Sequence, residues 1–145
     1  MDYFLNKPTG PPTDYVAPNW PSLRGWLIGP ASDEDLSDVL WFQGDILSFT
    51  LIWTLIAFSV MYGLAGCWAY VVFYRSRLGL VLLFAFIGIG LFAGSTSGAV
   101  IGVLLSGIYN AGYFAMATWL PLGWALVQVL ILVISSDADL SLNNL

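Results

Sequence analysis

Residues 90–106 read GLFAGSTSGAVIGVLLS and decide how this chain folds. Within them a small residue recurs at every fourth position: Gly90, Gly94, Gly98, Gly102 and Ser106. In a helix this spacing places all five residues on one face, where the backbone of another helix can approach closely. The spacing therefore predicts a helix-packing ridge. The ridge is buried against another helix of this chain or against a helix of a partner, and the pattern leaves both open.

The ridge lies inside a run of 59 residues, 78–136, that contains no Asp, Glu, Lys, Arg or His. One helix crosses the hydrocarbon core of a bilayer with ~20 apolar residues, so this run is sized for two crossings and a turn. Residues 46–74 supply a further uncharged stretch, long enough for a tilted crossing. The whole chain is 9% charged, whereas a soluble domain carries roughly 25% charged residues. We therefore expect an all-α integral membrane protein.

The expected order is an extramembrane segment, residues 1–45, then a bundle, residues 46–136, and a polar tail, residues 137–145. The bundle contains three transmembrane helices, at about 46–74, 79–106 and 117–134, sized by the bilayer core.

Residues 1–32 contain six prolines, which interrupt any regular helix, and interleaved aromatic residues. This Pro-rich and aromatic-rich segment fits a membrane surface or a partner protein; a loosely ordered leader is the alternative. Ser32 and Asp35 have the spacing of a capping box. They predict a short amphipathic helix that lies at the interface or forms the solvent end of the first crossing.

Orientation follows from Arg75 and Arg77, the only basic cluster in the chain. The positive-inside rule places this loop in the cytoplasm, and residues 1–45 then face the lumen or the exterior. Aromatic residues near the ends of the crossings are typical anchors at the membrane interface. The expected anchors are Trp41, Trp68, Tyr74, Tyr109, Tyr113 and Trp119.

The residues that usually carry chemistry are scarce. The chain has no His, which removes the commonest general base and the usual haem ligand. The acids between Asp33 and Asp38 are explained as helix-start residues. Four basic residues are too few for a nucleic-acid-binding surface. We therefore expect no enzyme activity, no metal site and no cofactor.

Polar side chains inside the crossings have a structural explanation. Gln128 is the only long polar side chain deep in the third crossing, and in lipid it should find a partner across a helix interface. The hydroxyl groups of residues 95–97 are expected to bond to backbone carbonyls of their own helix.

Several short motifs, in order along residues 41–136, resemble the transmembrane protein 170 family. They are LIWTL (51–55), YGLAG (62–66), RSRLG (75–79), GVLLSGIY (102–109) and LPLG (120–123). The resemblance implies a small three-helix protein of the endoplasmic reticulum and nuclear envelope. It also implies a role in membrane shaping and a link to bridge-like lipid-transfer proteins.

The sequence favours a non-catalytic accessory subunit that packs a transmembrane helix against its glycine ridge. With the resemblance, this becomes a subunit that organises endoplasmic reticulum membrane and supports phospholipid delivery to a bridge-like lipid-transfer protein. Membrane lipids and one larger membrane protein are the expected partners. Two alternatives stay open: a self-associating, homo-oligomeric membrane-shaping protein, and a small structural subunit of a bioenergetic complex.

Overall fold

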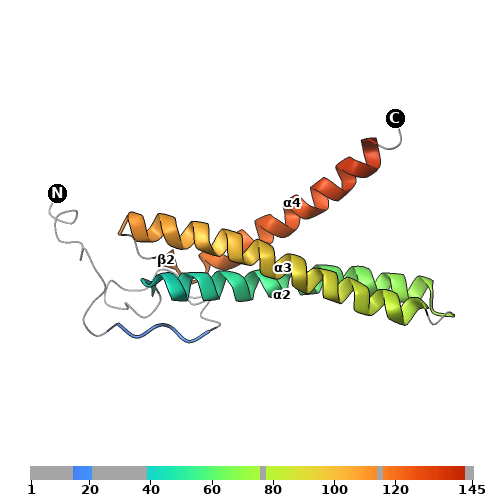
Figure 1. Cartoon of the computed structure of the whole chain (residues 1–145), viewed down its shortest axis with the longest axis horizontal. Coiled ribbons are helices and arrows are strands. Elements are labelled where there is room, and N and C mark those ends of the chain that lie inside the picture. Colours follow the sequence, from blue (N-terminus) through green and yellow to red (C-terminus); the bar gives the residue numbers. More distant parts are fainter. Residues whose placement is uncertain (1–14, 21–38, 76–77, 114–115, 143–145) are drawn as a thin grey trace.

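A computed structural model describes residues 15–20, 39–75, 78–113 and 116–142 (Figure 1). This part of the chain contains three long helices: α2 (Gln43–Val72), α3 (Leu78–Ala111) and α4 (Leu120–Leu142). Each of them is long and apolar enough to cross a membrane. The prediction of an all-α membrane protein with three transmembrane helices is confirmed.

A short antiparallel ladder closes one end of the bundle. Strand β1 (Val39–Leu40) pairs with β2 (Met116–Ala117), with Leu40 opposite Met116. Both of these side chains are fully buried, and they pack with Ile46, Phe49 and Leu105 in the small apolar core of this end. Burial of this apolar surface explains why the chain is extended here.

The ladder corrects two predictions. The short amphipathic helix was expected to continue through Val39 and Leu40, which are a strand; its earlier residues, including Ser32, lie outside the described residues. The third helix was expected from about residue 117, but β2 occupies that position and α4 begins at Leu120.

The helices are also longer than the sequence predicted. Helix α3 continues through the expected turn to Ala111, and the chain turns at Gly112 and Tyr113, whose φ of 53° is positive. Helix α4 continues to Leu142, into the expected polar tail. At 1.5 Å per residue, α2 and α3 are about 45 Å and 51 Å long, more than the ~30 Å of the bilayer core.

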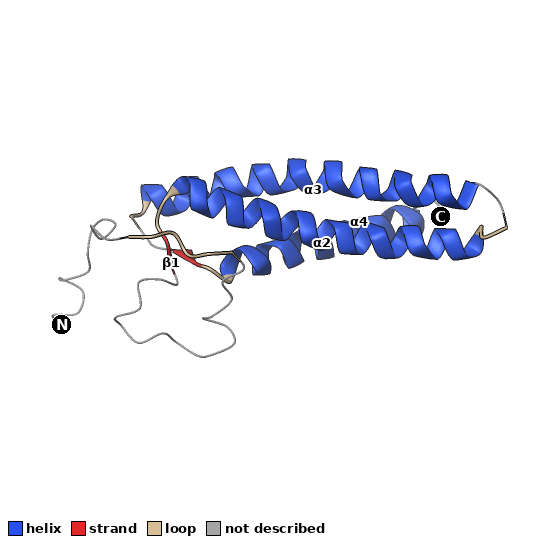
Figure 2. Cartoon of the chain, turned by 90° about the horizontal axis from the view of Figure 1, so that it is seen from below, coloured by secondary structure: helices blue, strands red, loops and turns tan. Residues whose placement is uncertain are grey.

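Helices α2 and α3 form an antiparallel hairpin, seen side by side in Figures 1 and 2, and the glycine ridge is the seam between them. The four glycines face α2 in reverse order: Gly90 faces Tyr62, Gly94 faces Phe58, Gly98 faces Thr54 and Gly102 faces Leu47. All four glycines are buried. The ridge is therefore packed within the chain, along the length of the hairpin.

The approach is close enough to exclude side chains. A Cβ added at Gly90 would lie 2.7 Å from the Tyr62 Cβ, and one added at Gly98 would lie 3.3 Å from the Leu51 Cα. A reciprocal small residue on α2, Gly66, meets Leu83 and Phe86 of α3 nearer the loop.

Helix α4 packs mainly on α2 and diverges from the hairpin toward its C-terminal end (Figure 1). The hairpin is thus closed, whereas its contact with α4 is open on one side.

Gly90→Ala should destabilise the bundle by about 1–3 kcal/mol, because the added methyl group overpacks the seam against Tyr62. Gly88→Ala is the matched control: it lies in the same helix, and its Cβ would meet nothing within 4 Å. Thermal unfolding in detergent measures the difference. Equal stability of the two variants would contradict the tight seam.

Candidate functional site

The open side of α4 is lined by three cavities. Two are almost purely apolar, with volumes of about 300 and 450 Å³, and lie along the α2–α4 contact. They share Met61, Leu126 and Val129 in their walls. The third, of about 430 Å³, lies nearer the end of α4 and shares Met61 and Val133 with the neighbouring cavity. The cavities therefore form one interrupted groove, which we name the α4 groove.

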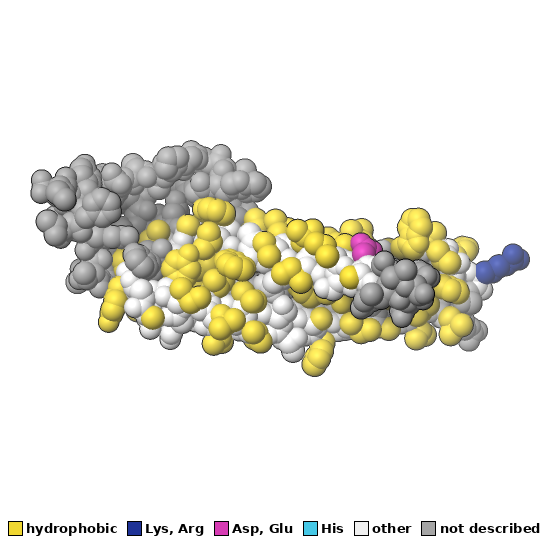
Figure 3. Space-filling view, turned by 90° about the horizontal axis from the view of Figure 1, so that it is seen from above, with side chains coloured by type: hydrophobic (Ala, Val, Ile, Leu, Met, Phe, Trp, Pro, Cys, Tyr) yellow, Lys and Arg dark blue, Asp and Glu magenta, His cyan; other side chains and the backbone are white. Residues whose placement is uncertain are grey.

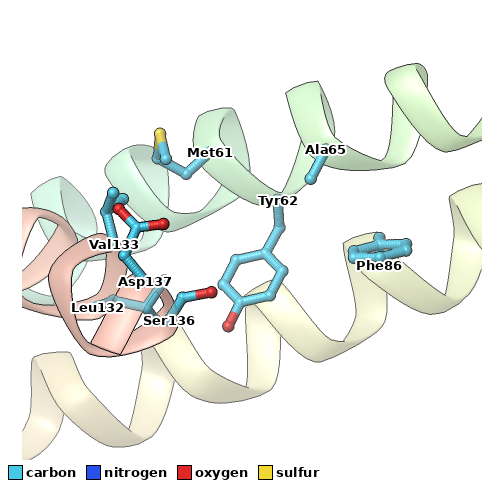
Figure 4. A pocket seen from close by; sticks show the side chains of 8 residues that line it. All are labelled: Met61, Tyr62, Ala65, Phe86, Leu132, Val133, Ser136 and Asp137. Atoms are coloured by element: carbon cyan, nitrogen blue, oxygen red, sulfur yellow. The ribbon is translucent and has the colours of Figure 1, made fainter. Parts of the chain in front are cut away.

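The third cavity differs from the others because polar side chains line it. Figure 4 shows the phenol of Tyr62 turned toward Ser136, with Asp137 on the same stretch of α4 near Met61. Phe86 of α3 closes the far side. We name this polar end of the α4 groove the recess. The site residues predicted from the sequence do not include it, since residues 137–145 were expected to be a polar tail.

The surface around the groove is strongly apolar. Figure 3 shows apolar side chains along most of the visible face, interrupted by acidic atoms, with the basic side chain at the far end of the molecule. The apolar side chains of α2 and α3 near their connecting loop are exposed, among them Leu64, Val71, Leu78 and Phe84. In a membrane protein such a surface faces acyl chains or another protein.

A polar cluster beside the groove joins the three helices. Gln128 of α4 is buried; its Oε1 accepts a hydrogen bond from Ser97 of α3, and its Nε2 donates to the Thr54 Oγ1 of α2 at 3.4 Å. Thr54 is also the residue that packs on Gly98. Gln128 was expected to find a partner across a helix interface, and its two hydrogen bonds are to side chains of the other two helices.

The neighbouring hydroxyl groups behave in two ways. Ser95 and Thr96 donate to the carbonyl oxygen of Phe92, at 2.9 and 3.0 Å, as expected for hydroxyls within a membrane helix. Ser97 was expected to do the same but instead bonds to Gln128. Ser106, the last residue of the ridge, is buried and donates to the Val103 carbonyl at 3.0 Å.

The predicted interface anchors fall into two groups. Trp68, Tyr74, Tyr113 and Trp119 are exposed, as an anchor requires. Trp41 and Tyr109 are half-buried, and Tyr109 packs against the apolar core beside the ladder. Arg75 is exposed at the hairpin loop, and Arg77 lies outside the described residues.

An N-terminal contact fastens the ladder to the start of α2. The Tyr15 hydroxyl donates to the Val39 carbonyl at 3.2 Å and to the Asp45 carboxylate at 3.3 Å, and it accepts from the Trp41 N–H at 3.4 Å. Its ring lies edge-on to Phe42. Burial raises the pKa of the Tyr15 phenol, with the Asp45 charge adding to the effect. The phenol is therefore protonated at neutral pH and can donate.

No group of three or more His, Cys, Asp or Glu side chains that could hold a metal ion occurs among the described residues. Cys67, the only cysteine of the chain, is exposed on α2. The α4 groove offers apolar volume and a few polar groups, the composition typical of a small-molecule binding site.

Gln128→Leu should weaken the attachment of α4 by about 0.6–2 kcal/mol, because it removes the hydrogen bonds to Ser97 and Thr54. Ser95→Ala is the control, since that hydroxyl bonds only within its own helix. The test is a double-mutant cycle with Ser97→Ala, read by unfolding in detergent. Additive effects of the two substitutions would contradict the cluster.

Tyr15→Phe should speed hydrogen exchange at the Trp41 amide, because it removes an acceptor that contributes about 1 kcal/mol. Tyr113→Phe, at an exposed ring, is the control. The folded state raises the pKa of Tyr15 above 10.0, so its contribution is complete below pH 10.0 and is lost as the pH rises further. The exchange rate of the wild-type Trp41 amide should then approach that of the variant at the same pH. A ratio of the two rates that stays constant as the pH rises would contradict the contact.

Comparison with known proteins identifies the family. The family model described as transmembrane protein 170A/B-like matches residues 40–140, which span all three helices. The uncharacterized protein YPR153W of Saccharomyces cerevisiae is 38% identical over 126 residues, which are 86% of this chain and 87% of the yeast protein. No solved structure matches. The chain therefore belongs to the transmembrane protein 170A/B-like family.

Proposed function

We propose that this chain is a non-catalytic membrane subunit that supports phospholipid delivery from its own bilayer to a larger lipid-transfer protein. The α4 groove carries the proposal. Its cavities of 300 to 450 Å³ lie between helices that are long enough to span the membrane. Each cavity has the volume of a site for a drug-sized group, and the three together follow one side of α4.

The closed seam supports this function over the alternative use of the glycine ridge. Because α2 occupies the ridge from Gly90 to Gly102, that face is not available to a foreign helix. The open side of α4, where the groove lies, remains accessible to a partner. A lipid leaving the groove must be received at its mouth, so the receiving protein should sit there.

A non-catalytic role agrees with the polar groups of the described residues. The hydroxyls of Ser95, Thr96 and Ser106 bond to backbone carbonyls, and those of Ser97 and Thr54 bond to Gln128. The first three hydroxyls bond within α3 and the last two join α4 to the hairpin, so all five have a structural role. The family is a family of transmembrane proteins, which favours the same role.

The site of action in this proposal is the endoplasmic reticulum and nuclear envelope, with the N-terminal segment in the lumen. Arg75 is exposed and follows the end of α2, whereas the ladder strand β1 precedes its start. This position at the hairpin loop supports a cytoplasmic loop by the positive-inside rule. A lipid-transfer protein bound at the loop side would then face the cytoplasm.

Photo-crosslinking in cells tests the partner. A photoreactive residue at Leu126, which lines the α4 groove, should capture a protein much larger than this chain. The same residue at Leu104 is the matched control: both leucines are exposed within membrane helices, at 59% and 56%.

Equal capture at both positions would contradict a partner at the groove. Capture of only a second copy of this chain at Leu126 would favour the self-associating, membrane-shaping protein instead. Capture of a cofactor-bearing respiratory or photosynthetic subunit would favour the bioenergetic alternative.

A further inference from the structure

The depth of the recess in the membrane is fixed from the loop side of the hairpin. The α2 residues in its wall, Met61 and Ala65, precede the end of α2 at Val72 by eleven and seven residues. At 1.5 Å per residue they lie about 16 and 10 Å from that end.

The residues between the recess and the loop are apolar and exposed. Leu64, Trp68, Val71 and Val72 of α2 are between 61 and 75% exposed. The α3 residues opposite them include Leu80, Val81 and Phe84, all more than half exposed. Exposure of so much apolar surface to water is unfavourable, so hydrocarbon reaches toward Trp68, an expected interface anchor. Ala65 and Met61 precede Trp68 by three and seven residues, about 4 and 10 Å along the helix, so the recess lies below the loop-side interface.

Asp137 is therefore a carboxylate inside the membrane, open to the α4 groove. The described residues offer it no ion pair, and the described basic side chain, Arg75, is beyond the end of α2. An ionisable group at such a depth is costly and marks a binding or transport site unless a partner compensates it.

The groups around the carboxylate define the chemistry of that partner. Asp137 accepts hydrogen bonds from a cation, whereas the Tyr62 and Ser136 hydroxyls can donate to an anion. All three line one cavity of about 430 Å³, and the apolar cavities continue from it along α4. A ligand that fits combines a positive group, a negative group and long hydrocarbon chains.

We propose that the recess binds the headgroup of a zwitterionic phospholipid, with its acyl chains in the α4 groove. The ammonium group pairs with Asp137, the phosphate accepts from Tyr62 and Ser136, and the chains contact Leu126, Val129 and Leu130. This inference rests on the proposed function and specifies its substrate class. It also gives the lipid an unusual position, with its headgroup drawn below the membrane surface.

The test is lipid retention by the purified full-length protein. The protein is equilibrated with mixed vesicles of phosphatidylcholine, phosphatidylethanolamine and phosphatidylglycerol, extracted gently and analysed by native mass spectrometry. Wild type should retain the two zwitterionic lipids in preference to the anionic one. Asp137→Asn should lower the retention of the zwitterionic lipids about tenfold or more, because it removes the negative charge that attracts the ammonium group of both lipids. For phosphatidylethanolamine, whose ammonium group carries N–H donors, it also removes a charge-assisted hydrogen bond.

The hydroxyl groups predict a different pattern. Tyr62→Phe and Ser136→Ala should lower the retention of all three lipids, because a phosphate is common to them. Ser135→Ala is the matched control: it is adjacent on α4, its hydroxyl bonds to the Ile131 carbonyl, and it does not line the recess. Thermal unfolding of each variant shows whether the fold is kept.

Equal retention of zwitterionic and anionic lipids by wild type would overturn the proposal. Unchanged retention by a folded Asp137→Asn protein would also overturn it. If that variant instead loses the large protein crosslinked at Leu126, the carboxylate pairs with a basic residue of the partner. The crosslink to wild type is measured independently of lipid retention. Failure of the lipid site therefore leaves the proposed accessory role intact, and failure to capture a large protein leaves the lipid site intact.

Discussion

The close approach of α2 and α3 is the constraint on which the rest of this structure depends. In a bilayer there is little hydrophobic drive to hold two apolar helices together, so packing contacts and hydrogen bonds must do so. The glycines from Gly90 to Gly102 let α3 come close to α2 over several turns. Because Thr54 belongs to this seam and also accepts from Gln128, the position of α4 depends on it as well.

The seam also explains why the groove is on the α4 side. Helix α3 uses its small-residue face for α2 and keeps larger side chains on its other faces. Helix α4 has no comparable row of small residues; Ala125 is fully buried, but Trp124 and Leu126 on either side are exposed. Its contact is close near the polar cluster and opens beyond it, which leaves room for a ligand.

Much of the fold could be predicted from residue spacing alone. The uncharged runs predict three crossings, and the four-residue period of the ridge predicts a packed face, although the period does not say which helix packs there. The ladder could not be predicted, because Val39–Leu40 and Met116–Ala117 are far apart in sequence and each strand has only two residues. Their extended form follows from the core around Leu40, which exists only in the folded chain.

The site was less predictable than the fold. Gln128 stands out in an apolar run, and its need for a partner can be read from the sequence, but the choice of Ser97 and Thr54 depends on the register of the helices. Asp137 follows 59 uncharged residues and therefore looks like the first residue outside the membrane. In the folded chain Asp137 lines the recess together with Tyr62 of α2 and Phe86 of α3, and this grouping depends on how α4 packs, which no local pattern encodes.

The β1–β2 ladder has a consequence for how the chain is inserted. Leu40 and Met116 can pair only if both are on the same side of the bilayer, and two helices lie between them. A chain in which α2 or α3 fails to cross would separate the two strands by the thickness of the membrane. The ladder and its contacts with Tyr15 therefore form only when both α2 and α3 have crossed the membrane. They stabilise the correctly inserted chain over a chain in which one helix has failed to cross.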